Sequence, residues 1–306
     1  MKNILRFLFA SCLAFFFLSA GDVPQPSPSS GFMVSGDTLR YFFAGHTYFW
    51  GHHKRVDFRL EALDYSIYDR VWLGGDVTSE ALSERSIIEY LDSLFDLSDP
   101  GNHWTLGNHC HRNGNLEWYE EVTGRRPYHA HYQDGITTVV MNTNLNPSNC
   151  EDLDRQFHMV ANVCDSIQAS SHLILLMHHH IWKDVPGLPP PSFFGNGGLE
   201  HWNTNCYDAD NYFSNTIYPK LLEVKARGIE VLCIMGDAGW NKGGAALSDD
   251  GINFLSSGIN NTFFLPDTVA FQNAPKDKVL IFEHIPDERL LRWEYQDLDS
   301  LYEAHK

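Results

Sequence analysis

The sequence has few basic residues for its length. Its 306 residues include 22 Lys and Arg against 39 Asp and Glu, which gives a formal net charge of −17. Sequence-independent binding to nucleic acid needs Lys and Arg side chains that displace counterions from phosphates. The charge balance therefore argues against a nucleic-acid partner and disfavours an anionic membrane surface. An acidic chain can still act on an anionic substrate when a bound metal ion supplies positive charge locally.

Cysteine is also scarce. Beyond the N-terminal segment the chain has five cysteines, whose spacing matches no zinc-binding or redox motif; they are Cys110, Cys150, Cys164, Cys206 and Cys233. Cys164 and Cys233 lie in apolar periodic segments and are predicted to be buried thiols. A disulfide among Cys110, Cys150 and Cys206 is compatible with an oxidising compartment, and the sequence does not choose between the pairs.

Long hydrophobic runs are absent except near the N-terminus. Residues 1–21 have a basic start, an apolar run and then small residues, which is typical of a secretory signal peptide. An uncleaved membrane anchor is the alternative, but the run is shorter than the ~20 residues that a spanning helix needs. Residues 22–36 are rich in Pro, Ser and Gly and predict a flexible leader. We therefore expect a secreted or periplasmic protein without a transmembrane span in its mature chain.

Residues 37–306 alternate between strand-like and helix-like segments and show no internal repeat. Runs of apolar and β-branched residues predict strands over 38–46, 69–77, 103–109, 136–143, 172–180, 229–235, 252–257 and 278–285. Apolar residues at helical spacing predict helices over 83–97, behind a serine cap, over 153–167 and over 213–227. Continuous apolar strands between helices indicate a sheet buried on both faces. We therefore predict a single layered domain of the α/β or αββα type.

One segment breaks this alternation. Residues 184–211 are dense in Pro, Gly, Asn and aromatic residues, and a loop of that length inside a compact domain is usually functional or disordered. The nearby aromatic residues are candidates for covering a site and stacking on a sugar or base; they are Trp182, Phe193, Phe194, Trp202 and Tyr207. The alternative is an apolar cluster beneath the loop.

Five of the predicted strands end in polar side chains or are directly followed by them. They are His46, Asp76, Asn108 with His109, His178 to His180, and Asp237. One polar residue after a buried strand is usually a turn or cap residue. Five in succession, all Asn, Asp or His, are harder to explain in that way. Ligands of such sheets bind at the carboxyl ends of the strands, so these residues are candidate metal ligands.

At these positions the chain resembles the calcineurin-like metallophosphoesterases. The motifs of that family run D-x-H, G-D, G-N-H-[DE], H and G-H-x-H, each at a strand end and in this order. The resemblance covers about residues 38–285: GGD at 74–76 and GNH at 107–109 match, and His178 matches the single histidine. An earlier GNH at 101–103 follows a proline rather than a strand, so we prefer the second. The resemblance implies a four-layer αββα sandwich, with central mixed sheets flanked by helices.

The chain also departs from the family pattern. Ala44 stands where the first motif has its aspartate, and Cys110 replaces the acidic residue after GNH. The last motif reads Gly-Asp-Ala-Gly, with Asp237 in place of its first histidine and no second one. One of the two metal positions should therefore be weaker than the other.

Carried over residue by residue, the resemblance implies one main ion held by Asp76, Asn108 and His178, with Asp237 as a fourth ligand. Such a mixed nitrogen and oxygen site suits zinc, manganese or iron. The other position keeps only His46 and the shared Asp76, so a second ion would be weakly held or absent. His52, His53 and His180 are alternatives that the sequence does not place.

The resemblance also implies a reaction. His109 would protonate the leaving oxygen or bind the phosphate, and the protein would be an exported metal-dependent phosphoester hydrolase acting on a small phosphoester or a phosphorylated glycan. His179 and His180 are predicted to line the pocket with Trp182 and Trp202. The alternative is a catalytically inactive relative that binds an extracellular ligand, such as a glycan, through the aromatic insertion.

Overall fold

A computed structural model of the protein describes residues 37–49, 51–112, 114–145, 150–194, 213–238, 243–259 and 276–306. The predicted signal peptide and leader lie outside the described residues, as do Trp202 and most of the 184–211 segment. Within the described part, no helix combines the length and the apolar character needed to cross a membrane.

The first of two mixed sheets has five strands in the order β13-β12-β1-β4-β5. Its strands are β1 (Leu39–Ala44), β4 (Arg70–Leu73), β5 (His103–Trp104), β12 (Lys278–Ile285) and β13 (Leu290–Asp297). β1, β4 and β5 run parallel, whereas β12 and β13 pair in antiparallel fashion. The carboxyl ends of β1, β4 and β5 therefore lie at one edge of the sheet.

The second sheet has six strands in the order β10-β11-β9-β8-β7-β6. Its strands are β6 (His129–Gln133), β7 (Ile136–Val140), β8 (His172–Met177), β9 (Glu230–Met235), β10 (Gly244–Leu247) and β11 (Asn253–Ser256). β7, β8, β9 and β11 are parallel, and the two edge strands are antiparallel to their neighbours. A separate hairpin joins β2 (Tyr48–Phe49) to β3 (His52–Val56).

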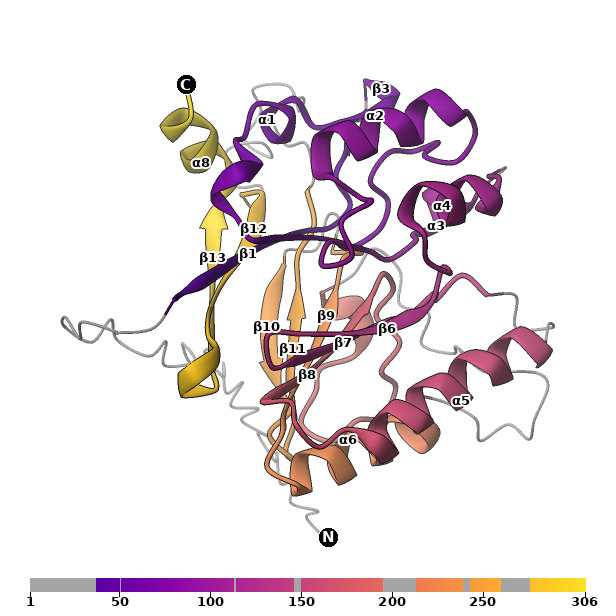
Figure 1. Ribbon diagram of the computed structural model, residues 1–306, viewed down its shortest axis with the longest axis vertical. Coiled ribbons are helices and arrows are strands. Elements are labelled where there is room, and N and C mark those ends of the chain that lie inside the picture. The colour runs from indigo at the N-terminus through magenta and orange to yellow at the C-terminus, as the bar shows by residue number, and fades with distance from the viewer. Residues whose placement is uncertain are drawn as a thin grey trace, which may run out of the picture. The chain divides into compact units, whose positions relative to one another are not determined.

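Seven α-helices occur among the described residues. They are α1 (Phe58–Glu61), α2 (Arg85–Phe95), α3 (Asn108–His111), α4 (Leu116–Thr123), α5 (Cys150–Ser166), α6 (Phe213–Ala226) and α8 (Leu298–Ala304). Short 3-10 turns cover η1 (Tyr65–Ile67), η2 (Pro191–Phe193) and η5 (Pro286–Glu288). Figure 1 shows α2 and α4 beside the five-stranded sheet and α5 and α6 beside the six-stranded sheet.

Three hydrophobic clusters bury the faces of these elements. Residues of α2 and α4 pack with one face of the five-stranded sheet, in what we name the α2 cluster. Residues of α5 and α6 pack with one face of the six-stranded sheet, in what we name the α5–α6 cluster. A third cluster, which we name the inter-sheet cluster, contains side chains from both sheets, among them Phe43, Leu176 and Phe282. Successive strand residues divide between clusters, because strand side chains alternate between faces: Phe42 belongs to the α2 cluster and Phe43 to the inter-sheet cluster.

The predicted strands over 38–46, 69–77, 136–143, 172–180, 229–235, 252–257 and 278–285 are confirmed within a few residues, as are the three predicted helices. The prediction for 103–109 was too long, because the strand covers only His103–Trp104 and α3 begins at Asn108. The serine cap of α2 was wrong: Glu84 occupies the N-cap, and the Ser83 hydroxyl donates to the Glu80 carbonyl instead.

The buried cysteines follow the prediction in part. Cys164 and Cys233 are buried free thiols, as expected. Cys110 is also a buried free thiol and contributes to the α2 cluster, so the disulfide considered for it is not present. Cys206 lies outside the described residues, and the side chain of Cys150 is not described.

Candidate metal centre

The ends of three strands meet through glycines that leave no room for a side chain. A Cβ atom on Gly236, after β9, would lie 1.9 Å from the Gly74 carbonyl oxygen, and one on Gly45, after β1, would lie 2.3 Å from Gly236 Cα. Real Cβ contacts are never this short, so backbone touches backbone at this junction. The glycines thereby bring the residues that follow them, from both sheets, to one place.

Two of those residues have strained backbones. His46 and Asp76 have φ angles of 51° and 50°, in the left-handed region that residues other than glycine seldom adopt. Each strand end is tied to the other, because the His46 amide donates to Gly75 and the Tyr48 amide donates to Asp76. Backbone strain of this kind costs about 1 kcal/mol or more and gathers at functional sites.

Asp76 is buried and lies at the centre of the group. The backbone N–H of His109 donates to Asp76 Oδ1 at 2.7 Å, and a Cβ on Gly107 would lie 2.1 Å from the same oxygen. Burial alone would raise the pKa of Asp76, but nearby His178, His46 and His109 outweigh it and hold that pKa well below its usual value. The side chain is therefore a carboxylate across the neutral range.

His178 presents an unpartnered nitrogen to two carboxylates. Its Nδ1 lies 2.7 Å from the Gly74 carbonyl oxygen, which can only accept, so Nδ1 carries the hydrogen. Nε2 lies 3.4 Å from Asp76 Oδ2 and 3.9 Å from Asp237 Oδ1, both longer than a normal N–H···O bond. Fully buried, Nε2 has no hydrogen-bond partner among the described residues. Either a proton or a cation would satisfy it.

Electrostatics favour positive charge at this point. Burial lowers the pKa of His178, but the carboxylates of Asp76 and Asp237 outweigh it and raise the pKa to about 9. The same field that stabilises an imidazolium would stabilise a metal ion beside a neutral imidazole. The bond from Nδ1 to the Gly74 carbonyl orients the ring as the outer partners of metal-bound histidines do.

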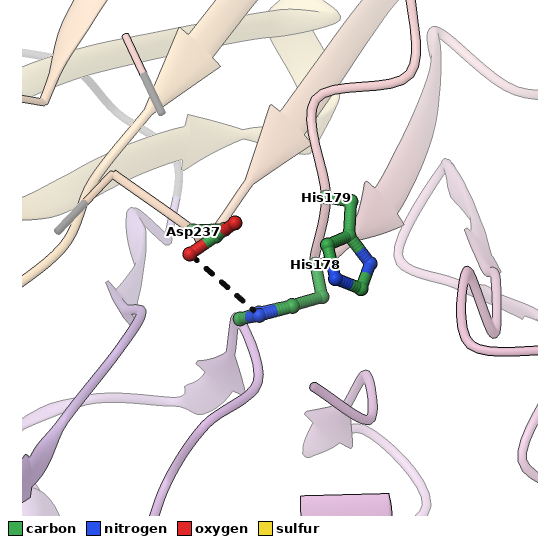
Figure 2. A group of neighbouring side chains, drawn as sticks. All are labelled: His178, His179 and Asp237. Carbon is green, nitrogen blue, oxygen red and sulfur yellow. Dashed lines mark ion pairs between the residues drawn. The ribbon is translucent and has the colours of Figure 1, made fainter. Parts of the chain in front are cut away.

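His178, His179 and Asp237 form the group that the geometry favours for sharing an ion. One ligand atom from each lies within 4.8 Å of the others, and all three residues are buried. Figure 2 shows the His178 ring pointing toward Asp237, with His179 next to it. The Asp237 amide donates to the His178 carbonyl, which fixes the ends of β8 and β9 together. Imidazole and carboxylate donors suit zinc, manganese or iron.

His179 was predicted to line the pocket, and the structure also makes it a potential ligand. Its Nδ1 is 2.7 Å from the Thr143 hydroxyl, and its ring lies 4.6 Å from that of His178. Burial, followed by the neighbouring His178, holds the pKa of His179 well below its usual value, so this imidazole is neutral. A neutral imidazole is the form that binds metals.

His109 and His46 both contact the ring of Tyr48. The Tyr48 ring lies 4.6 Å from the His46 ring and 5.1 Å from the His109 ring. Burial lowers the pKa of both histidines, and Asp76 opposes that shift in each case. His46 Nδ1 contacts the carbonyl of Ile259 at 3.2 Å. His109 Nδ1 is buried and has no hydrogen-bond partner among the described residues.

The remaining predicted residues fall into two groups. Asn108 is exposed and lies between Gly107 and His109, the two residues that contact Asp76. His180 and Trp182 lie in the core instead: His180 Nε2 is 2.6 Å from the Ser256 hydroxyl, and the Trp182 indole donates to Pro189. The Trp182 ring belongs to the α5–α6 cluster, which is the packing alternative considered for it.

The other histidines and the earlier GNH make contacts of their own. His53 Nδ1 lies 3.1 Å from the Ser79 hydroxyl, and the His52 ring stacks on Phe49. Asn102 accepts from the Val71 amide and donates to the carbonyls at the end of α2, which fixes β5 against β4. The preference for the second GNH agrees with this structural role of the first.

Sequence reasoning missed two residues at this centre, Tyr48 and Thr143. Tyr48 was visible only as an aromatic two residues after His46, because its contacts depend on the β2–β3 hairpin. Thr143 follows β7 as the other polar residues follow their strands, and that signal was present in the sequence but unused.

Comparison with known proteins supports the fold. No family model and no curated protein matches the chain. Its structure is similar to GAP50, the anchor in the inner membrane complex of Plasmodium, with a TM-score of 0.52, 10% identity and 85% of each chain covered. Vps29 from Entamoeba histolytica, solved with Zn²⁺, matches at a TM-score of 0.31 and 12% identity over 85% of this chain and 99% of that one. At such identities the first likeness shows a shared phosphoesterase-like α/β fold alone, and the second is too weak for argument.

Proposed function

We propose that the chain is an exported, metal-dependent phosphoester hydrolase built as a four-layer αββα sandwich. One ion would be held firmly by Asp76, His178, His179 and Asp237, with Asn108 as a further donor. A second ion, beside His46, would be held weakly or not at all. The substrate would be a small phosphoester or a phosphorylated glycan.

The observation that carries this proposal is the Nε2 atom of His178. It is buried, without a hydrogen-bond partner in the described part of the chain, and directed at two buried carboxylates. A proton on Nε2 reaches the two carboxylates only through contacts longer than a normal hydrogen bond, at 3.4 and 3.9 Å. A cation bound between these groups would offset the negative charge of Asp76 and Asp237 and leave the imidazole neutral.

When bound, a divalent ion lowers the pKa of a water ligand and offsets charge on the phosphoryl oxygens. The chain's own residues would do the rest. His109, partly buried beside Asp76, would give a proton to the leaving oxygen. Arg112, an exposed cation close enough to lower the pKa of His109, would attract the phosphate.

A catalytically inactive ligand-binding protein is the second candidate. Its support is the incomplete first metal position, where His46 already contacts the Ile259 carbonyl and Ala44 replaces the usual aspartate. GAP50, which shares the fold, is itself named as an anchor. In this case the buried carboxylates and histidines would stabilise the fold around a structural ion, and a glycan is the proposed ligand.

The two candidates separate in one experiment. Purified protein would be analysed for zinc, manganese and iron, and its hydrolysis of an aryl phosphate would be measured with D76N, H109Q and the matched control H158Q, an exposed histidine on α5. The hydrolase predicts about one equivalent of metal, activity lost in D76N and reduced about 10²–10⁴-fold in H109Q, and no change in H158Q.

Metal without turnover across several phosphoesters would favour the binding protein. Protein that binds none of the three metals would contradict the metal centre itself.

A further inference from the structure

His109 lacks the hydrogen bond that would hold its ring in place. Its Nδ1 atom is buried and has no partner in the described part of the chain. The side chain of the next residue, Cys110, is buried in the α2 cluster and therefore does not serve as a hydrogen-bond partner for His109. An acid that transfers a proton must be held in one orientation toward the substrate. Something other than a bond to Nδ1 has to orient this imidazole.

Tyr48 is placed to do so. Its ring lies 5.1 Å from the His109 ring with an angle of 30° between the planes, and 4.6 Å from the His46 ring. Aromatic rings at such distances attract each other by about 0.5–1.5 kcal/mol beyond the area that they bury. Tyr48 therefore touches the two histidines that come from the first and third strand-end motifs.

The backbone holds Tyr48 in this position. Its amide donates to the carbonyl of Asp76 at 3.2 Å, and β2 pairs with β3. The next residue, Phe49, stacks on His52. The hairpin therefore supplies one aromatic ring to the metal centre and a second ring outside it.

We propose that Tyr48 is a positioning residue, whose ring holds the His46 and His109 imidazoles in the orientation that the centre needs. The phenol stays protonated in this role, because burial, and then Asp76 and Asp237, raise the pKa of Tyr48 to about 12. The catalytic consequence rests on the proposed hydrolase function, whereas the orientation of His109 does not.

The test therefore measures orientation and rate separately. In the full chain, the ring-proton NMR signals of His109 would be assigned with H109Q and compared in wild type, Y48F, Y48L and the matched control F49L. A stacked aromatic ring shifts the signals of its neighbour upfield. We expect Y48F and F49L to keep that shift and Y48L to lose it. Y48M, also without a ring, would replace Y48L if Y48L did not fold.

In the kinetic arm, Y48L should lower kcat about 10–100-fold with little change in KM, the size of effect seen when the orienting partner of a site residue is removed. Y48F should lose less than about threefold, because the ring stays in place.

Unchanged His109 signals in Y48L would overturn the proposal. A fall in kcat in Y48F as large as that in Y48L would also overturn it, because the Tyr48 hydroxyl rather than the ring would then be the group that matters. A wild-type protein without turnover would contradict the hydrolase function alone, because the NMR arm would still decide the role of Tyr48.

Discussion

Two buried histidines in this chain, His178 and His103, have pKa values shifted in opposite directions. In the candidate metal centre, carboxylates raise the pKa of His178 to about 9. In a second group, which we name the edge cluster (His103, His129 and His131), burial lowers the pKa of His103 well below its usual value and that of His129 to about 4. The edge cluster lies on β5 and β6, where His129 Nε2 is 3.4 Å from His103 Nδ1.

The difference comes from the neighbours, not from burial. His178 and His103 are both almost inaccessible to solvent. His178 faces the carboxylates of Asp76 and Asp237, whereas His103 faces two other histidines and the cations Arg125 and Arg70. A buried histidine therefore indicates a cation site only when buried carboxylates accompany it, and otherwise it is a neutral core residue.

The same substitution at the two groups should have different effects, and this is the largest contrast that we expect. H178Q removes the buried donor between Asp76 and Asp237, so metal affinity should fall at least about 100-fold and aryl-phosphate hydrolysis should fall with it. H103Q should leave metal content and kcat unchanged while altering stability. Metal analysis and steady-state kinetics of both variants check this, and equal metal loss in the two would remove the contrast.

The glycine junction offers a second contrast, in stability. G236A places a methyl group 1.9 Å from the Gly74 carbonyl oxygen, where only backbone can move away. We expect a loss of about 3 kcal/mol or more in the free energy of unfolding, at the upper end of the cost of overpacking. G228A, whose methyl group would meet no atom within 4 Å at a φ of 81°, should cost only about 1 kcal/mol. Urea denaturation would measure both, and similar losses would contradict a tight junction.

We expect acid to destabilise the folded protein through the edge cluster. The folded pKa of His129 is about 4, below its ordinary 6.5, so the unfolded chain binds more protons between these values. The stability contributed by neutral His129 is therefore complete above pH 6.5 and is lost as pH falls toward 4, by about 3 kcal/mol. His131, Arg125 and the Arg126 carbonyl also face this ring.

Denaturation curves between pH 7 and 4 for wild type and H129Q would test this, with H158Q as the control for an exposed histidine. We expect the free energy of unfolding to fall less on acidification in H129Q than in wild type, and H158Q to behave as wild type. Parallel curves for wild type and H129Q would show that His129 is not a source of the acid sensitivity.

The smallest expected effect concerns the exposed arginines beside each group. R112A removes the cation near His109 and should raise KM for an aryl phosphate up to about fivefold, since an exposed charge pair contributes no more than about 1 kcal/mol. R126A, beside the edge cluster, should leave KM unchanged. Kinetics at low and high salt would measure both, and the R112A effect should shrink as salt rises.

The sequence was most informative where one element determines its own structure. Apolar runs predicted β8 and β9 because strands buried on both faces carry apolar residues at every position. β6 was missed because its alternation of partly buried and exposed residues includes His129 and His131, which do not signal a strand. The two-residue β2 depends on pairing with β3, so its local sequence carries little signal.

The candidate metal centre was likewise predictable from the sequence only in part. The polar residues after each strand were visible in sequence, and Asp76, His178 and Asp237 do come together. Their meeting rests on contacts between Gly74 and Gly236, which lie far apart in the chain and belong to different sheets. His179 was visible among the residues that end β8, whereas Tyr48 joins the centre through the packing of its ring against His46 and His109, which no local pattern records.

The donors of the centre come from different sheets: Asp76 follows a strand of the five-stranded sheet, while His178 and Asp237 follow strands of the six-stranded sheet. A cation bound by all three would be a cross-link between the two halves of the domain. Occupancy and global unfolding would then be thermodynamically linked, so that an ion at 100 times its dissociation constant would add about 2.7 kcal/mol to the unfolding free energy. Calorimetry with successive divalent ions would therefore rank their affinities before any substrate is known.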